Sequence, residues 1–534
     1  MYALTRPSQP FERSLETSIA AADYSHALDT IAMNWATLAY THGRQLRDWV
    51  RQIPEQLWNS DARIIAALGA SHRSHDSTET SAALPHFELA EALISAGISS
   101  AAELPAIQVQ HAAALRGAGL LDAARAKANS AWRLLQDDLN LTLPLRLTLQ
   151  AEASLQLGLV NLHDGQFSDA VRQLQLAAGL SDNGLADSDL LECLGALAFA
   201  AYAGGEFDTA ERHLARARAV TDDSLIRHSR FGAPALIAET LIAADRNDAV
   251  QAHAGAAALH TAAELTDWEP LALYARAVAT AINGQLIEAL DLQRRCIASV
   301  HGWEGRPTAI TFAETLRAGL HLHLGEPKRA TELLQAIEPL ADHISCPGSL
   351  RASIRFTSGD FAGCLEALLD CAAMGDQHSE RTAADFLLLT AAANYELGDA
   401  VAADVAFDQA LYLGSQTGIR VPFLVMPRIT MLRMLNRAAD RYQPVAVDRL
   451  LDELRVGSAT SGEPTEPLSD RELEIARLLF QDKTSGQIAA ELFISVNTVK
   501  THVRSIYRKL SATSRKEAVK RVHELGLDMK ITPF

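Results

Sequence analysis

A series of regularly spaced glycines limits the possible folds of this chain more than any other feature of its sequence. Successive glycines are separated by 46, 40, 79, 41, 34 and 39 residues, so one unit recurs about every 40 residues and the longest gap spans two units. One copy of the turn is therefore expected near residues 243–249. The series consists of Gly119, Gly165, Gly205, Gly284, Gly325, Gly359 and Gly398.

The residues around these glycines keep their order from copy to copy. Gly165 and Gly205 are each followed by Phe at the second position and by Ala, Leu and Ala at the fifth, ninth and twelfth positions. Another small residue stands seven positions before most of the glycines. Glycine suits a tight turn, small residues allow close helix contact, and large apolar residues join one unit to the next. The pattern predicts an all-α solenoid of antiparallel helical hairpins.

The offsets resemble those of tetratricopeptide repeats, although the period is longer than the usual 34 residues. The resemblance implies a helical-repeat body whose concave surface binds a small effector or a protein partner. We expect residues 1–85 to form an N-terminal helical segment of this body and residues 86–454 to form its repeats.

Composition favours a globular, helical protein without a membrane segment. Hydrophobic residues make up 48% of the chain and charged residues 21%, and alanine, the strongest helix former, is abundant. No apolar run approaches the length of about 18 residues that a spanning helix needs, and the N-terminal residues lack the apolar segment of a signal peptide. The five cysteines form no CxxC pair, which favours buried, inert thiols in a reducing compartment. We therefore expect a cytoplasmic protein.

Charge is divided unevenly along the chain. Residues 465–534 contain twelve Lys/Arg and nine Asp/Glu, a balance of +3, so the remainder must carry −20 to give the net charge of −17. Residues 455–467, RVGSATSGEPTEP, are rich in Ser, Thr, Gly and Pro and have little to bury, which is typical of a linker. The sequence thus predicts an acidic body joined to a small basic domain at residues 468–530.

Capping residues and apolar spacing predict four helices in this C-terminal domain. Ser469 and Thr484 open the first two helices, each with Glu or Gln three positions later, as in a capping box. Ser495 caps the third helix, expected at about residues 496–510, and the fourth begins at Ser514.

The third helix carries polar and basic residues largely off its apolar face. A helix of this kind fits the major groove with its N-terminal half against base edges, where Lys and Arg donate to guanine acceptors. Hydroxyl groups and helix N-termini can bond phosphates. For any single residue, a solvated basic face on an ordinary helix is the alternative. The residues concerned are Asn497, Lys500, Thr501, Arg504 and Arg508.

The segment LSDRELEIARLLFQDKTSGQIAAELFISVNTVKTHVRSIYRKLSATSRKEAV resembles the LuxR-type helix-turn-helix domain along its whole length. The resemblance implies that Lys500, Thr501 and Arg504 face the bases. It implies backbone contacts from Thr484, Ser495, Asn497, Thr498 and Lys509, and we add Arg508 and Arg515 to the expected DNA-binding set. The last helix of the family, here about residues 515–525, commonly forms the dimer contact, so we expect a homodimer on double-stranded DNA.

The segment His42–Ala70, with the repeats behind it, resembles the sensor half of large MalT-like LuxR regulators. Those regulators carry an ATPase domain ahead of this region. The sequence contains no GxxxxGK[ST] loop to hold phosphates, so we expect no nucleotide switch and no cofactor.

The body offers weaker candidates for binding sites. Trp268, Trp303 and Arg306 fall at similar positions between repeats and could line one rim, where the rings would stack on an effector. The alternative is that the tryptophans pack against helix ends. The residues His72–Asp76 have metal-ligand types but lie in a Ser/Thr-rich stretch typical of a loop, and we expect neither a metal site nor a catalytic site.

These observations favour a sequence-specific DNA-binding transcription regulator whose helical-repeat body senses a small effector or protein partner. The alternative hypothesis is a repeat scaffold for protein assembly with a weak or vestigial DNA-binding domain. An enzyme is not expected.

Overall fold

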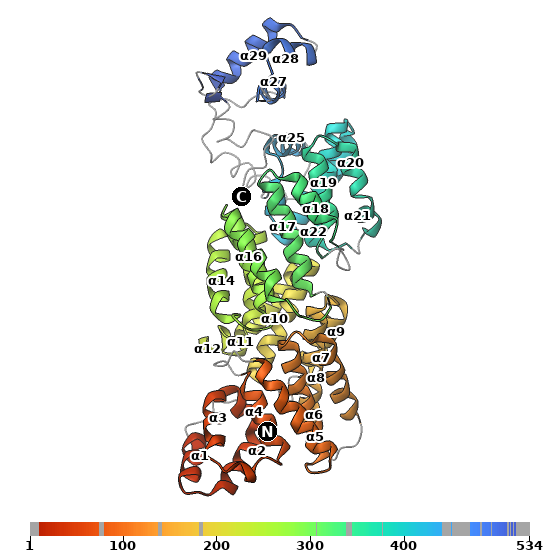
Figure 1. Cartoon of the computed structure of the whole chain (residues 1–534). Helices are drawn as coiled ribbons and strands as arrows, with labels where there is room; N and C mark the ends of the chain where they lie inside the picture. The colour runs from red at the N-terminus through yellow and green to blue at the C-terminus, as the bar shows by residue number, and fades with distance from the viewer. Residues whose placement is uncertain are drawn as a thin grey trace. The chain divides into compact units, whose positions relative to one another are not determined.

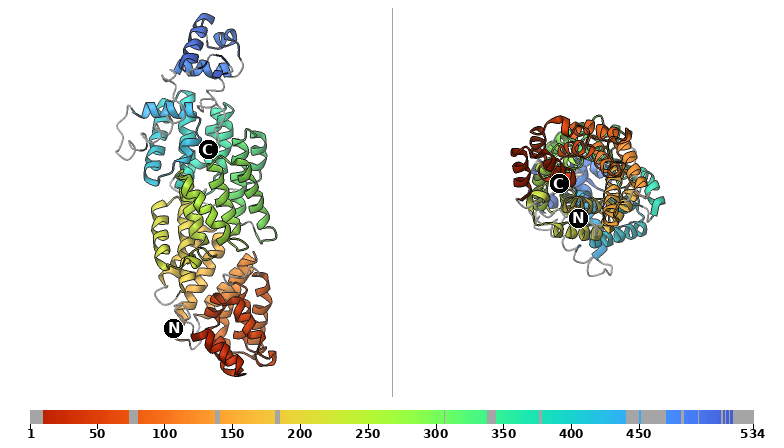
Figure 2. Two further views of the ribbon diagram at one scale, coloured as in Figure 1. Left: turned by 90° about the vertical axis from the view of Figure 1, so that its left-hand side faces the viewer. Right: turned by 90° about the horizontal axis from the view of Figure 1, so that it is seen from below.

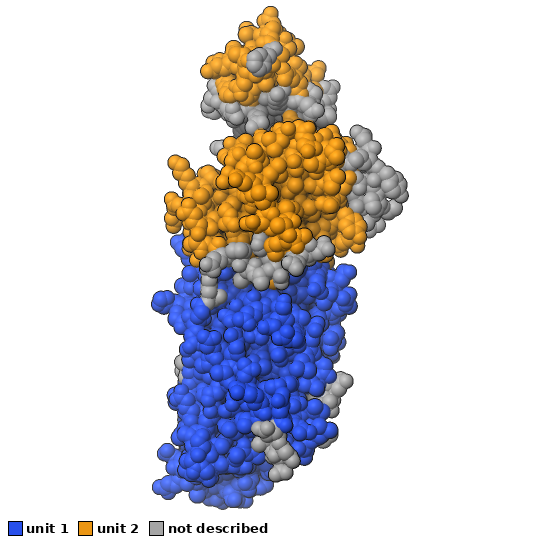
Figure 3. Space-filling model, turned by 90° about the vertical axis from the view of Figure 1, so that its right-hand side faces the viewer, with its two compact units in different colours: residues 1–243, 249–279, 288–313 blue, residues 244–248, 280–287, 314–534 orange. Residues whose placement is uncertain are grey.

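The computed structural model describes residues 10–73, 80–136, 141–180, 185–305, 307–337, 344–375, 378–439, 450, 470–480, 483–492, 494–509, 512, 514–515 and 517–518. Across these residues the regular structure is entirely helical, as predicted (Figure 1). The chain divides into two compact units, coloured in Figure 3. Unit 1 comprises residues 1–243, 249–279 and 288–313, and unit 2 comprises residues 244–248, 280–287 and 314–534.

The N-terminal helices of unit 1 enclose a core of their own. Its large members include Trp35, Trp49 and Phe87, which are almost fully buried among aliphatic side chains. The helices are α1 (Pro10–Ala20), α2 (Tyr24–Thr41), α3 (Gly43–Arg51), α4 (Ala62–Ser71) and α5 (Leu84–Ser95), with short 3₁₀ turns at Glu55–Leu57, Thr80–Ala83 and Ala101–Glu103. The described residues of the segment expected at residues 1–85 are therefore largely helical.

Helical hairpins follow, and the partners of each hairpin pack against one another (Figures 1 and 2). Three of them are α6 (Leu104–Gly117) with α7 (Leu121–Leu134), α8 (Leu143–His163) with α9 (Phe167–Gly179), and α10 (Asp187–Gly204) with α11 (Phe207–Val220). After the short α12 (Ser224–Arg227) come α13 (Ala233–Asp245), α14 (Ala249–Ala262), α15 (Glu269–Ile282) and α16 (Leu286–Ser299).

The chain continues with α17 (Thr308–His323), α18 (Pro327–Leu334), α19 (Pro347–Thr357), α20 (Phe361–Ala367), α21 (Leu369–Met374), α22 (Glu380–Leu397), α23 (Ala400–Thr417), α24 (Val421–Val425) and α25 (Arg428–Ala439). Among the residues that the structure describes, none of the helices is both long and apolar enough to cross a membrane.

The glycine series marks the turns of the hairpins, as predicted. All seven glycines have a φ between +77° and +93°, a conformation that a Cβ disfavours. The copy expected near residues 243–249 is the turn between α13 and α14, where Asn247 takes the left-handed conformation with a φ of +59°. Asn tolerates that conformation better than most residues, so the series continues there without a glycine.

The small residues before the turns allow the helices of a hairpin to touch. A Cβ added at Gly158 on α8 would lie 2.6 Å from a side-chain carbon of Leu174 on α9. The corresponding Ala198, Ala277 and Ala352 are at most 1% exposed. Close helix contact at these positions explains why the pattern keeps them small.

Candidate nucleic-acid interface

Three helices at the C-terminal end surround a separate small core. They are α27 (Asp470–Phe480), α28 (Ser485–Glu491) and α29 (Val496–Lys509). Ile475, Ile488, Val499 and Ile506 are completely buried between them. These residues stand at the apolar positions from which the helices were predicted, so the helix-turn-helix arrangement of α28 and α29 follows from their spacing.

The first of these two helices begins with the predicted capping box. The Thr484 hydroxyl accepts from the backbone N–H of Gln487 at 3.3 Å, and the Gln487 side-chain oxygen accepts from the Thr484 N–H at 2.8 Å. The reciprocal bonds satisfy backbone donors that a helix start otherwise leaves open and fix the direction in which the first turn of α28 points.

Helix α29 begins with Ser495, also as predicted. Its hydroxyl accepts from the backbone N–H of Thr498 at 3.0 Å and lies 2.7 Å from the Thr498 hydroxyl. Both side chains are exposed at the positive end of the helix dipole. A phosphate placed there would meet two hydroxyl groups and the backbone donors of the first turn.

The two faces of α29 are chemically opposite. Val499 and Ile506 face the core, whereas the predicted DNA-contact residues are exposed to solvent. At about 100° per residue, the exposed residues fall within an arc of about 100° along one side of the helix. This stripe consists of Asn497, Lys500, Thr501, Arg504 and Arg508, and we call it the α29 stripe.

One exposed apolar residue accompanies the stripe and was not singled out from the sequence. Val496, in the first turn of α29, is 42% exposed. An apolar side chain at this end of a helix is suited to contact with thymine methyl groups in a major groove. The sequence gives only a weak signal for it, because valine at a helix start is usually part of the core.

Lys509 lies at the edge of the domain core, not on the stripe. Its ammonium group donates to a carboxylate oxygen of Glu472 at 2.7 Å, and the Ser505 hydroxyl donates to the other oxygen at 2.6 Å. The side chains of Glu472 and Lys509 are 6% and 14% exposed. Glu472, predicted as a capping partner of Ser469, therefore joins α27 to α29; Ser469 itself lies outside the described residues.

Arg515 also makes an internal contact, because its guanidinium donates to the backbone carbonyl of Leu479 near the end of α27. A cation at this position satisfies a carbonyl that the helix leaves open. Of the predicted fourth helix, residues 514–515 and 517–518 are described; most of the expected dimer segment, and the linker at residues 455–467, lie outside the described residues.

In unit 1, the residues proposed to stack on an effector have a different environment from the one expected. Trp268 is completely buried, its Nε1 donates to Glu192 at 2.9 Å, and its ring lies 4.9 Å from the His163 ring. Trp303 packs over the turn at Gly119, where an added Cβ would lie 2.4 Å from the indole. The rim position predicted for Trp268 is thus corrected to an interior one; Arg306 lies outside the described residues.

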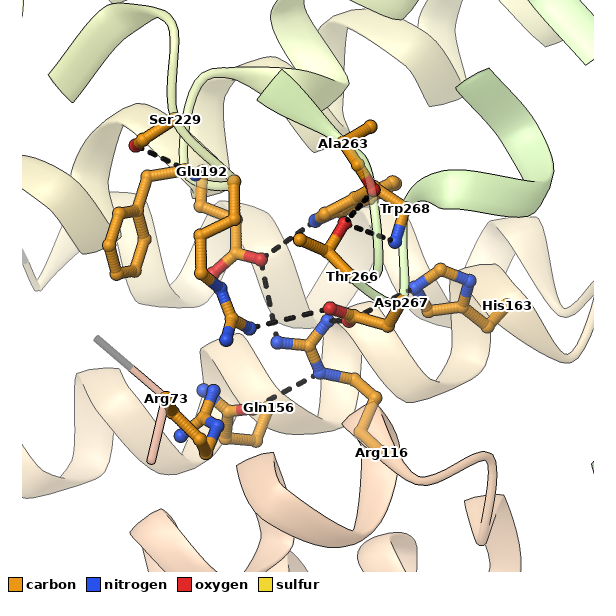
Figure 4. A network of polar contacts seen from close by, with 12 residues as sticks. Arg73, Arg116, Gln156, His163, Glu192, Ser229, Ala263, Thr266, Asp267 and Trp268 are labelled. Carbon is orange, nitrogen blue, oxygen red and sulfur yellow. Dashed lines mark hydrogen bonds and ion pairs between the residues drawn. The ribbon is translucent and has the colours of Figure 1, made fainter. Parts of the chain in front are cut away.

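Trp268 belongs to a buried network of charged groups, drawn in Figure 4. Arg116 on α6 donates to Asp267 and, at 3.4 Å each, to Glu192 and Gln156. Arg230 donates to the other oxygen of Asp267 at 3.3 Å. Burial opposes the charge on Asp267, but the charge of Arg116, the imidazole of His163 at 3.6 Å and the charge of Arg230 hold its pKa well below the ordinary value.

Sequence reasoning missed this network. Its members come from distant parts of the chain, with 151 positions between Arg116 and Asp267, so no local pattern indicates it. In the stretch His72–Asp76, which has metal-ligand residue types, His72 stacks on His86 with ring centres 5.7 Å apart, and residues 74–76 lie outside the described residues.

Comparison with known proteins identifies the C-terminal domain. Residues 466–522 match the model of the family "Bacterial regulatory proteins, luxR family". Over 79 residues the chain is 37% identical to the HTH-type transcriptional regulator MalT of Serratia proteamaculans. The aligned stretch covers 15% of this chain and 8% of MalT. Over 90 residues it is 38% identical to the transcriptional regulatory protein LiaR of Bacillus subtilis, and this stretch covers 16% of this chain and 43% of LiaR.

Two solved structures are similar to this chain at low sequence identity. A Rap protein complexed with Competence and Sporulation Factor covers 68% of this chain at 13% identity, with 99% of its own length and a TM-score of 0.47. The Cut9-Hcn1 hetero-tetramer of the APC/C covers 82% of this chain at 12% identity, with 95% of its own length and a TM-score of 0.38.

The stretches shared with MalT and LiaR correspond to the domain of α27, α28 and α29 and leave most of the body unmatched. The capped helices, the exposed stripe and the family match therefore agree on one region of the chain. At its C-terminal end this chain carries a helix-turn-helix domain of the luxR family of bacterial regulatory proteins, joined to a body of helical hairpins.

Proposed function

We propose that this protein is a transcription regulator that binds double-stranded DNA in a sequence-specific manner. The observation that carries the proposal is the α29 stripe, which is exposed along one side of a helix whose other side forms the domain core. A 14-residue helix is about 21 Å long, and the major groove is about 12 Å wide, so the stripe can reach several base pairs.

Within the stripe, Lys500, Thr501 and Arg504 are assigned to the bases. No described residue forms a hydrogen bond or ion pair with the charged groups of Lys500 or Arg504, so binding DNA would break no contact between them and the described residues. Each good contact between such a side chain and a base contributes about 1–3 kcal/mol of discrimination.

A second set is assigned to the phosphate backbone. It consists of Thr484 at the start of α28, of Ser495, Asn497 and Thr498 at the start of α29, and of Arg508 further along α29. Lys509 and Arg515 are also assigned to the DNA-binding set, but their internal contacts give them a second role in stabilising the domain. We propose that two copies bind a two-fold symmetric site, because most regulators of this architecture use paired half-sites.

The experiment is selection of binding sites from genomic DNA by the purified chain, followed by titrations of the selected site and an unrelated duplex at several salt concentrations. Lys500→Ala and Arg504→Ala should each lower the ratio of specific to non-specific affinity by about 5- to 150-fold. Asn497→Ala should weaken both duplexes alike. Lys328→Ala, which removes an exposed lysine from α18 in the body, is the control and should leave both affinities unchanged.

Two outcomes would contradict the proposal. One is full sequence preference in the Lys500→Ala/Arg504→Ala double variant, which would show that another surface contacts the bases. The other is no sequence preference in the unmodified chain at physiological salt, which would favour the protein-assembly scaffold. Lys509→Ala is tested for domain stability at the same time, because loss of its Glu472 contact would weaken DNA binding through unfolding.

We further propose that the body receives the controlling signal from a small effector or a protein partner. The support is architectural: arrays of helical hairpins present extended concave surfaces. Repeating the site selection with and without cell metabolites or lysate fractions tests the proposal. A change in DNA affinity that requires the full chain supports it, and identical titrations under all conditions would contradict it.

A further inference from the structure

Three side chains in unit 2, all of metal-ligand type, converge in the interior. Cys346 stands at the start of α19, Cys371 lies in α21, and His378 lies just before α22. One ligand atom from each lies within 4.8 Å of the other two, and the sulfur atoms of the cysteines are 3.5 Å apart. The side chains are between 2% and 7% exposed.

The other buried cysteines with hydrogen bonds behave differently. Cys193 donates its S–H to the carbonyl of Leu174 at 3.3 Å, and Cys296 donates to the carbonyl of Pro270 at 3.0 Å. These are ordinary contacts of inert, buried thiols. The two cysteines therefore fit the sequence expectation, and the group at Cys346 does not.

The sulfur of Cys346 is surrounded by donors. The backbone N–H of Ser349 donates to it at 3.4 Å and the Ser349 hydroxyl lies at 3.3 Å. A backbone N–H can only donate, and the sulfur also stands at the N-terminus of the 11-residue α19, where the helix dipole favours negative charge. The surroundings therefore favour a thiolate.

The backbone leaves room for this close approach. A Cβ added at Gly348 would lie 3.2 Å from the sulfur of Cys371, closer than nearly all real contacts of that kind. The imidazole is held by its Nδ1, which is 3.1 Å from the backbone carbonyl of Ser379. A histidine that ligates a metal usually donates its other ring N–H to a group of this kind, so the ligand atom here would be Nε2.

We propose that Cys346, Cys371 and His378 form a binding site for a thiophilic divalent cation of the zinc class. Two sulfurs and one imidazole nitrogen are a ligand set that zinc prefers. In a tetrahedral site with Zn–S bonds of about 2.3 Å, two sulfurs lie about 3.8 Å apart, close to the separation here. A water molecule or another exogenous ligand completes the four positions.

Metal binding is an exchange in which protons leave the ligands and the cation takes their place. Each cysteine that still holds its proton releases it to solvent as the cation binds, and no electrons are transferred. Phe356, Leu368 and Leu388 belong to the same core cluster as the two cysteines, and the buried carboxyl of Asp385 interacts electrostatically with Cys346, His378 and Arg381. A bare thiolate is costly in the interior of a protein, and a divalent cation offsets its charge. The site would link three helices of unit 2.

The test uses the full chain, reduced and treated with chelator, with thiol titration verifying that all five cysteines are free. Dialysis against Zn²⁺ followed by elemental analysis should give about one equivalent bound tightly. Cys346→Ser, Cys371→Ser and His378→Ala should each lower the affinity at least tenfold. Cys364→Ser, which changes a buried cysteine of the same core cluster, is the matched control and should keep the metal.

Titration with Co²⁺ gives a second readout, and its result for the unmodified chain does not depend on the folding of any variant. The unmodified chain should show a thiolate-to-cobalt charge-transfer band of the intensity expected for two thiolates, and each serine variant should halve it. Absence of the band in the unmodified chain, or undiminished zinc binding by a folded Cys346→Ser/Cys371→Ser double variant, would overturn the proposal. DNA titrations play no part in these measurements, so the metal site and the DNA-binding function stand or fall separately.

Discussion

Asp267→Asn removes one negative charge from the interior of unit 1, and we expect it to destabilise that unit strongly. The carboxylate is fully buried and accepts from Arg116 and Arg230, with the His163 Nε2 atom 3.6 Å away. Asparagine has nearly the same shape, so the substitution changes charge with little change in packing. It leaves two buried guanidinium groups with one fewer negative partner.

The expected cost follows from burial. Removing one partner of a buried ion pair typically costs about 3–5 kcal/mol, because the remaining charge cannot be solvated. The same unit contains a partly exposed pair of the same residue types. Arg125 donates to Asp164 at 2.6 Å, but their side chains are 26% and 23% exposed. Asp164→Asn should therefore cost under about 1 kcal/mol and is the matched control.

Tryptophan fluorescence during urea unfolding measures the effect. All six tryptophans of the chain lie in unit 1, so the signal reports that unit alone. With a slope of up to about 3 kcal/mol per molar urea, a loss of 3–5 kcal/mol lowers the midpoint by at least about 1 M. Equal midpoints for Asp267→Asn and Asp164→Asn would refute the reasoning, because the network would then contribute no more than an exposed pair.

Three further predictions concern single positions. Burial raises the pKa of Asp189 to about 7, so between pH 3.8 and 7 the folded chain holds a proton that the unfolded chain has released. The stabilisation that this group provides is complete below pH 3.8 and decreases as the pH rises toward 7, by up to about 4 kcal/mol. Asp189→Asn should therefore make the urea midpoint of unit 1 less dependent on pH over that range, and an unchanged pH profile would contradict the assignment. Gly119 has a φ of +78°, and an added Cβ would lie 2.4 Å from Trp303, so Gly119→Ala should lower the free energy of unfolding by more than about 2 kcal/mol. Gly97 has a similar φ of +72° but nothing within 4 Å of an added Cβ, so Gly97→Ala should lower it by about 1 kcal/mol in the same fluorescence assay. Gly486→Ala, where the nearest atom is 4.0 Å away, should slow hydrogen exchange of the α28 amides by stabilising that helix by about 0.5–1 kcal/mol; faster exchange would show that the first turn needs glycine.

Local features of the fold could be predicted because they depend on residues near one another in sequence. A glycine at a left-handed turn and a small residue seven positions earlier are sufficient to indicate a hairpin, and all seven glycines of the series have the expected left-handed conformation. The capping residues Thr484 and Ser495 likewise act within three residues of themselves. The α29 stripe follows from the 3.6-residue period alone.

The roles of individual charged residues were harder to predict, because they depend on which helices meet. Lys509 and Arg504 look alike in the sequence, yet Lys509 pairs with Glu472, 37 positions earlier, and Arg504 is exposed. The same limit applies to Cys346 and Cys371, which are 25 positions apart and meet only after their hairpin has folded. Trp268 follows a loop in which Leu265 has a φ of +58°, a conformation that the sequence does not suggest.

Unit 1 also departs from the simplest physical picture of a repeat protein, in which each repeat contacts only the repeats next to it. The backbone N–H of Glu304 donates to the carbonyl of Gly119 at 2.9 Å, and the Thr308 hydroxyl donates to the carbonyl of Leu162 at 2.7 Å. Together with the ion pair of Arg116 and Asp267, these contacts join hairpins that are several repeats apart in the chain. Because such contacts form only when the intervening hairpins are in place, they couple the folding of those hairpins. We therefore expect unit 1 to unfold in one transition, and a buried charge removed at Asp267 to weaken the whole unit rather than one hairpin.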